Sequence, residues 1–223
     1  EVVIYVAHWD HLGQDESLDG DHIFNGAADN ATGTAGMIEL ARAFTQAPES
    51  PRRSILFLAV TAEEQGLLGS KYYGENPLYP VAQTVAAFNM DVLNQWGRTR
   101  DMTIVGLGQS ELDHYAMAVA RRSGRALNPD PEPEKGFYYR SDHFSFARAG
   151  IPAFYAEPGI EYLDKPEGYG LLKREEYTAN DYHKVSDEVK PNWDLSGAVE
   201  DLTFMYELGS MVVESDAWPE WSP

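Results

Sequence analysis

The sequence contains no cysteine, which excludes disulfide bonds and thiolate metal sites. Basic residues are scarce: 17 lysines and arginines stand against 36 aspartates and glutamates, giving a formal net charge of −19. That charge disfavours binding to nucleic acid or to an anionic membrane surface, and it favours binding of cations. No apolar run approaches the ~20 residues that a membrane-spanning helix requires, so we expect no membrane insertion.

The chain also has no signal peptide and no initiator methionine. It begins directly on an apolar segment, residues 2–7, that is typical of a buried strand. We therefore expect that an N-terminal segment packing beside this strand is missing, and that any targeting segment has been removed.

Apolar runs at residues 2–7, 54–60, 85–90, 102–105 and 151–156 predict strands, and a helical period predicts helices over residues 34–46, 112–123 and 195–213. Polar or glycine-rich stretches at residues 13–28, 127–136 and 157–182 are expected to be loops. This alternation predicts one α/β domain over residues 1–214, with a mostly parallel sheet and helices on both faces, followed by a tail over residues 215–223.

Ligands of such sheets bind beyond the carboxyl ends of the strands, and acidic or imidazole side chains gather at the expected ends here. We expect the Asp10 carboxylate to accept the second ring N–H of His8 and so to fix its tautomer. Taken singly, each of these residues also suits an ordinary role such as a helix cap or a solvated acid. The metal-competent side chains at these positions are His8, Asp29, Glu64, Asp91 and His183, with Glu63 beside Glu64.

Two imidazoles and several carboxylates without sulfur favour Zn²⁺, with Co²⁺ or Mn²⁺ as possible substitutes. Five ligands exceed the need of one tetrahedral zinc. Two ions ~3.5–4 Å apart that share one carboxylate would use them all. The sequence therefore predicts a site for two divalent ions.

The ordered motifs AHWD, GAADNATG, TAEEQGLLGS, NMD and YHKVSD resemble metallopeptidase family 28, as does RSDHF followed by GIPA. The resemblance runs from His8 to the last expected helix. It implies a zinc-peptidase (phosphorylase/hydrolase-like) fold, with residues 1–214 as the catalytic domain of a di-zinc aminopeptidase. It further implies peptide substrates with a free N-terminus and export from the cytoplasm.

The same resemblance assigns the metal ligands. His8 would share its ion with Asp91, His183 would share the other ion with Glu64, and Asp29 would bridge the two. Relatives bend the bridging carboxylate into place through a cis peptide bond, so the bond between Asp29 and Asn30 is expected to be cis.

Glu63 would then act as the general base that activates a metal-bridging water. Tyr182 resembles the family tyrosine that stabilises the oxyanion, and Tyr139 competes for that role; core packing explains either tyrosine equally well. Arg140 is a candidate for substrate contact. Asp142 and His143 are expected to be structural, and three histidines are expected at the surface: His11, His22 and His114.

Two alternatives use the same fold. A glutaminyl cyclase, which is an acyltransferase, has a similar ligand set. A non-catalytic binding protein of the transferrin-receptor-like branch is the other alternative, and the intact Glu63 and ligand set argue against it. The chain departs from the family in lacking the usual N-terminal elements and a protease-associated domain. Its sequence specifies neither the preferred side chain of the substrate nor the oligomeric state.

Overall fold

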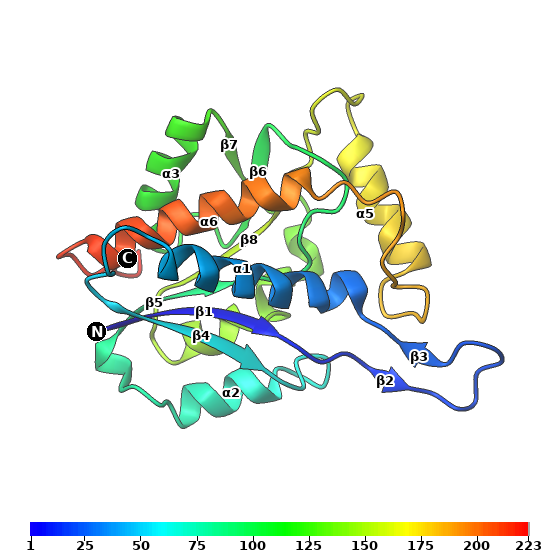
Figure 1. Ribbon diagram of the computed structural model, residues 1–223, viewed down its shortest axis with the longest axis horizontal. Helices are drawn as coiled ribbons and strands as arrows, with labels where there is room; N and C mark the ends of the chain where they lie inside the picture. The colour runs from blue at the N-terminus through cyan, green and yellow to red at the C-terminus, as the bar shows by residue number, and fades with distance from the viewer. Residues whose placement is uncertain (223) are drawn as a thin grey trace.

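The computed structural model describes residues 1–222, which form a sheet of six strands in the order β4-β1-β5-β8-β6-β7 (Figure 1). All neighbouring strands are parallel except β6 and β8, which are antiparallel. The predicted α/β class with a mostly parallel sheet is therefore confirmed. The strands are β1 (Val2–His8), β4 (Ser54–Val60), β5 (Thr84–Asn89), β6 (Asp101–Val105), β7 (Ala126–Pro129) and β8 (Ala153–Pro158).

Helices cover both faces of the sheet because alternate side chains of the central strand β1 point to opposite faces. Val3 and Tyr5 pack in one core, with α1 (Gly33–Thr45), α3 (Leu112–Ser123) and α6 (Ser196–Glu214). Ile4 and Val6 pack in the other core, with α2 (Leu68–Glu75) and α4 (His143–Arg148). Figure 1 shows α1 and α6 on the side of the sheet opposite to α2.

The helix α1 has the period that its sequence predicts. Met37, Leu40 and Phe44 are buried in the core with Tyr5, and each such side chain contributes about 1.5–3 kcal/mol on burial. The Tyr5 hydroxyl donates to the carbonyl of Met205 on α6 over 2.9 Å. This packing fixes the strand β1 and with it the position of His8 at its end.

Three stretches expected to be loops contain regular structure. The helix α5 (Tyr169–Asn180) lies within residues 157–182, and its sequence gave no apolar period because Gly170 is its one buried residue. Arg174 joins α5 to Glu157 by an ion pair. Two tyrosines of α5 also contact rings outside it, Tyr169 with Tyr162 and Tyr177 with Trp96. The edge strand β7 overlaps the start of residues 127–136, and the short strands β2 (Gly13–Gln14) and β3 (Ile23–Phe24) form a hairpin within residues 13–28.

The strand β1 is paired on both edges, with β4 and with β5. Both edges of β1 are therefore occupied within the sheet, and the packing of a preceding segment beside residues 2–7 stays a prediction. In the tail, the Trp221 indole donates to the carbonyl of Gly150 over 3.2 Å, and residue 223 lies outside the described part of the chain. None of the helices that the structure describes is long and apolar enough to cross a membrane.

The carboxyl ends of β1, β4 and β5 meet at one end of the sheet. Figure 1 shows α5 and the β2–β3 hairpin at that end, and the start of β1 and the last turns of α6 at the opposite end. The fold therefore gathers the predicted metal ligands at one end of the molecule.

Candidate metal centre

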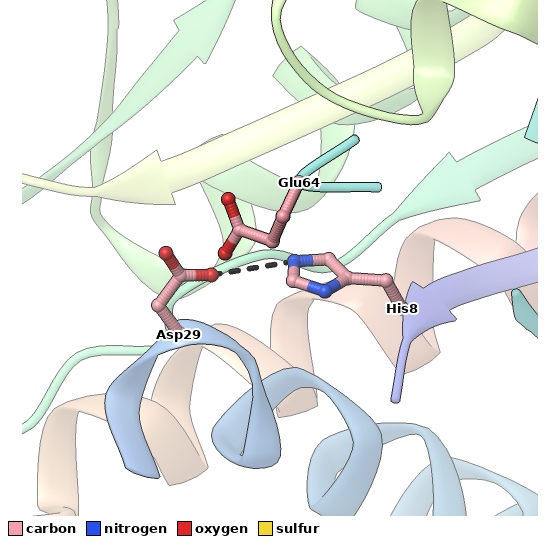
Figure 2. A group of neighbouring side chains, drawn as sticks. All are labelled: His8, Asp29 and Glu64. Atoms are coloured by element: carbon pink, nitrogen blue, oxygen red, sulfur yellow. Dashed lines mark ion pairs between the residues drawn. The ribbon is translucent and has the colours of Figure 1, made fainter. Parts of the chain in front are cut away.

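Two histidines from distant parts of the chain meet on the two oxygens of Asp29. His8 ends β1, and its Nε2 lies 3.3 Å from Asp29 Oδ1. His183 follows α5, and its Nε2 lies 3.4 Å from Asp29 Oδ2. Figure 2 shows the side chains of His8, Asp29 and Glu64 turned toward one another from three separate segments. Asp29 therefore occupies the position between two imidazoles that a bridging carboxylate needs.

Each histidine also meets a second carboxylate, and the partner differs. His8 Nε2 lies 3.4 Å from Asp91 Oδ1, just beyond the end of β5. His183 Nε2 lies 2.8 Å from Glu64 Oε2. The contacts thus divide into a His8–Asp91 half and a His183–Glu64 half, with Asp29 between them.

The structure corrects the role expected for Asp10. The second ring nitrogen of His8, Nδ1, lies 3.0 Å from the backbone carbonyl of Asp10 and not from its carboxylate. The carboxylate instead accepts from the Thr61 hydroxyl at 2.9 Å and from the Ala62 amide at 2.7 Å. Those two donors stand where β4 ends, so Asp10 orients His8 with its backbone and ties β4 to β1 with its side chain.

Asp29 sits on a turn that other residues hold in place. The bond between Asp29 and Asn30 is cis, as expected. The backbone amides of Ala28 and Asp29 both donate to the Asp187 carboxylate, the latter over 3.0 Å. The Tyr177 hydroxyl donates to the same carboxylate over 3.3 Å. No role was expected for Asp187 beyond its place in the YHKVSD motif.

A second chain of hydrogen bonds orients Asp91. The Asn89 amide donates to Ser141 Oγ over 2.7 Å, and Ser141 Oγ donates to Asp91 Oδ2 over 2.7 Å. This leaves Asp91 Oδ1 for His8. Ser141 belongs to the RSDHF motif, and its role there was not foreseen.

His11 was expected at the surface, and the structure places it inside the site. Its side chain is 5% exposed, and its Nδ1 lies 2.8 Å from Glu64 Oε1. The segment that follows β1 stays at the site and brings His11 to Glu64. The available signal in the sequence was this second histidine, three residues after His8. His114 is exposed as expected, and His22 is half-buried.

The surroundings of the two adjacent glutamates shift their pKa values in opposite directions. Burial, and after it the negative charge of Asp91, raise the pKa of Glu63 to about 9. Burial would also raise the pKa of Glu64, but the adjacent His11 and His183 lower it to about 2. Glu63 is 8% exposed and belongs to a group with His8 and Asp91 whose ligand atoms lie within 4.8 Å of one another.

The neighbouring carboxylates raise the pKa values of both His8 and His183. Burial opposes the charged form of His8, but Asp29 and Asp91 outweigh it and raise its pKa to about 12. Asp29 and Glu64 raise the pKa of His183 to about 9. The carboxylate cluster therefore attracts positive charge strongly, as a cation site must.

Several atoms that face the centre of the cluster fit a metal by their chemistry. Within residues 1–222 they are buried and lack a well-oriented hydrogen-bond partner. Orphaned polar atoms of this kind are costly in a folded protein unless a ligand or ion serves them. They are His8 Nε2, His183 Nε2 and Asp91 Oδ1. Glu64 Oε1 and both ring nitrogens of His11 share this property, but Glu64 Oε1 faces His11 Nδ1 at 2.8 Å.

A cleft of about 480 Å³ opens over Asp29, Glu63 and Asp91. Tyr182 and Arg140 line it. The Tyr182 ring stacks on the His183 ring at 3.8 Å between centroids. Further lining is provided by the aromatic residues Trp96, Phe137, Tyr155 and Tyr177.

The competing tyrosine, Tyr139, is 64% exposed and lines a separate groove between α2 and α4. Asp142 and His143 are each 1% exposed, and the His143 ring lies between Tyr138 and Tyr155 at 5.0 and 4.8 Å. Burial lowers the pKa of His143 to about 3, which keeps this ring neutral.

The model of peptidase family M28 matches residues 1–206. The chain belongs to peptidase family M28.

Among curated M28 relatives, an aminopeptidase of Bacillus subtilis, YwaD, is 30% identical over 171 residues, which are 74% of this chain and 34% of that protein. Leupeptin-inactivating enzyme 1 of Streptomyces exfoliatus is 32% identical over 64% of this chain and 32% of its own length. The chain thus spans about a third of the length of these relatives.

Solved structures share the fold at low identity. The LapA aminopeptidase of Legionella pneumophila superposes with a TM-score of 0.68 at 18% identity, covering 97% of this chain and 52% of that chain. An aminopeptidase from Aneurinibacillus sp. strain AM-1 gives a TM-score of 0.67 at 21% identity, covering 98% and 45%. These likenesses confirm the predicted fold.

Proposed function

We propose that this M28 domain is a di-zinc aminopeptidase. One observation carries the proposal: His8 and His183 lie on opposite oxygens of Asp29, at 3.3 and 3.4 Å, and each has a further carboxylate of its own. Names of relatives support it, since YwaD is called an aminopeptidase and several fungal relatives are called probable zinc metalloproteases.

In this proposal His8 and Asp91 would hold one ion, His183 and Glu64 would hold the other, and Asp29 would serve both. Co²⁺ or Mn²⁺ would substitute for Zn²⁺, because the donor set is imidazole and carboxylate. Two zinc ions bound there would supply Lewis acidity for the scissile carbonyl and lower the pKa of an attacking water toward ~7.

The chain's own residues complete the chemistry. Glu63 is buried beside His8 and Asp91 at the floor of the cleft, so it suits a group that takes a proton from the attacking water and passes it to the leaving amine. Tyr182 lines the cleft and is braced by its stack on His183, so its hydroxyl is the better placed of the two tyrosines to donate to a developing oxyanion. Arg140 is positioned at the cleft wall for contact with the peptide.

The cleft offers carboxylate acceptors for an ammonium group. Beyond the acids at the metal centre, its lining includes Glu175, which has no basic partner among the described ion pairs, and Glu132 and Glu157, which pair with Lys135 and Arg174. A free N-terminus would find hydrogen-bond acceptors there, whereas an acylated one would leave them unpaired. Sites built to hydrogen-bond a group reject analogues without it by factors of about 10⁴.

The test compares three forms of one peptide. N-acetylation is expected to abolish turnover, and amidation of the C-terminus is expected to change kcat/KM little. The readout is release of the N-terminal residue by the zinc-loaded chain, across a panel of aminoacyl substrates. Comparable cleavage of the acetylated peptide would overturn the aminopeptidase assignment, and ring closure of an N-terminal glutamine without hydrolysis would indicate the cyclase.

We also propose that the protein works outside the cytoplasm. One solved relative, from Shewanella amazonensis, is described as a peptidase M28 precursor, which supports export. Fractionation of cells that produce the natural full-length protein would test this location.

A further inference from the structure

His11 lies against the outer oxygen of Glu64. His11 Nδ1 is 2.8 Å from Glu64 Oε1, while His183 Nε2 is 2.8 Å from Glu64 Oε2. The two oxygens of one carboxylate thus face two different imidazoles. If Oε2 turns to an ion that it shares with His183, Oε1 stays with His11.

The His11 ring is fixed by close packing. It meets the His183 ring edge to face at 5.7 Å, with 65° between the planes. On its other side is Gly26, whose φ is +59°. A Cβ at Gly26 would lie 2.6 Å from His11 Cγ, so a glycine is needed there both for its backbone conformation and for the close approach of the ring.

His11 and His183 contact the cluster differently. His183 Nε2 reaches carboxylate oxygens of both Asp29 and Glu64, at 3.4 and 2.8 Å. His11 contacts Glu64 alone, on the oxygen that His183 does not reach. Its place suits a residue that orients a ligand rather than one that binds the ion.

We propose that His11 is a positioning residue that fixes the Glu64 carboxylate and so sets the affinity of the ion shared by Glu64 and His183. Partners behind a ligating carboxylate commonly change metal affinity by about 10–100-fold when they are removed. Glu64 depends on such a partner because it follows β4 on a loop, and because Oε1 is buried where solvent does not serve it. The inference rests on the proposed two-ion centre.

The experiment titrates Zn²⁺, and then Co²⁺, into the metal-free 223-residue chain by calorimetry, with the visible absorption of Co²⁺ as a second readout. His11→Leu keeps apolar bulk beneath Gly26 and removes the donor. His11→Asn keeps an N–H donor near the position of Nδ1. The matched control is His114→Leu, an exposed histidine on α3. If leucine prevents folding, His11→Gln replaces it, because its amide is one bond further out.

We expect His11→Leu to weaken one of the two binding steps by about 10–100-fold and to leave the other within about threefold. His11→Asn is expected to restore most of the lost affinity, and His114→Leu to change neither step. The thermal midpoint of the metal-free protein is expected to stay close to that of the wild type.

Unchanged binding in His11→Leu would overturn the inference. Equal weakening of both steps, together with a lower midpoint of the metal-free protein, would overturn it as well and would make His11 a general packing residue. The wild-type chain is titrated before the variants. Binding of fewer than two ions by the wild type would contradict the proposed function itself.

Discussion

The two halves of the metal centre are built differently. In the first, His8 ends a central strand that is paired on both edges, its side chain is 1% exposed, and Asp91 follows the neighbouring strand β5. In the second, His183 lies on a turn after α5 with a φ of +57° and a side chain that is 35% exposed. The sheet itself places one half, whereas the other depends on side chains that brace it.

Those braces are visible in the structure. Tyr182 stacks on His183, and His11 lies behind Glu64. Asp29 belongs to both halves and is held through its backbone by Asp187. We therefore expect the ion of the His183–Glu64 half to be the weaker bound and the more easily exchanged.

The largest effect is expected from the residue that the halves share. Asp29→Ala should reduce kcat/KM by more than about 10³-fold, because bound metal supplies several kcal/mol of transition-state stabilisation and neither half keeps its full ligand set. Metal analysis after dialysis should show that both ions are weakened. Retention of one tightly bound ion would contradict the bridging role of Asp29.

Adjacent glutamates offer the next comparison. Glu63→Gln should keep both ions and lower kcat by a factor on the order of 10²–10⁴, as for a lost general base. Glu64→Gln should instead lose metal from the His183 half alone. For both variants, kcat is measured at saturating substrate and the bound metal is quantified. Near-wild-type kcat in Glu63→Gln would contradict its assignment as the base.

A smaller effect concerns acid stability near the His8–Asp91 half. His143 is neutral in the fold because burial lowers its pKa to about 3, against an ordinary value of 6.5. The unfolded chain therefore binds the proton first, and the stabilisation present above pH 6.5 is lost as the pH falls toward 3. Between pH 7 and pH 5 this loss amounts to about 2 kcal/mol.

His143→Leu is expected to remove that part of the pH dependence, whatever its stability at pH 7. Denaturant unfolding of the wild type and the variant at both pH values checks this, and the difference between the two proteins removes the contribution of all other groups. If the free energy of unfolding changes equally between pH 7 and pH 5 in both proteins, His143 titrates normally in the fold.

The same contrast explains what the sequence predicts well. Continuous apolar runs identified β1, β4 and β5, and the residues following them supplied His8, Asp91 and the glutamate pair. The helix α5 escaped prediction because Gly170 is its one buried residue, and its contacts to the domain are an ion pair and partly exposed tyrosines. Ligands at strand ends are therefore easier to recognise in the sequence than the supporting residues on exposed helices and loops.

Residues that act through others were the hardest to foresee. The Asp10 carboxylate was expected on His8, but the Thr61 hydroxyl and the Ala62 amide compete for it. Ser141 and Asp187 lie far from their partners in the chain, and neither has a pattern that singles it out. His11 was expected at the surface, and its partner Glu64 is distant from it in the chain.

The central claim is that two ions bind here with Asp29 between them. A crystal of the zinc-loaded protein, measured on both sides of the zinc absorption edge, tests it most directly. The account predicts two anomalous peaks, one beside His8 and Asp91 and one beside His183 and Glu64, with the second at lower occupancy after brief chelation. A single peak, or a second peak away from Asp29, would contradict it.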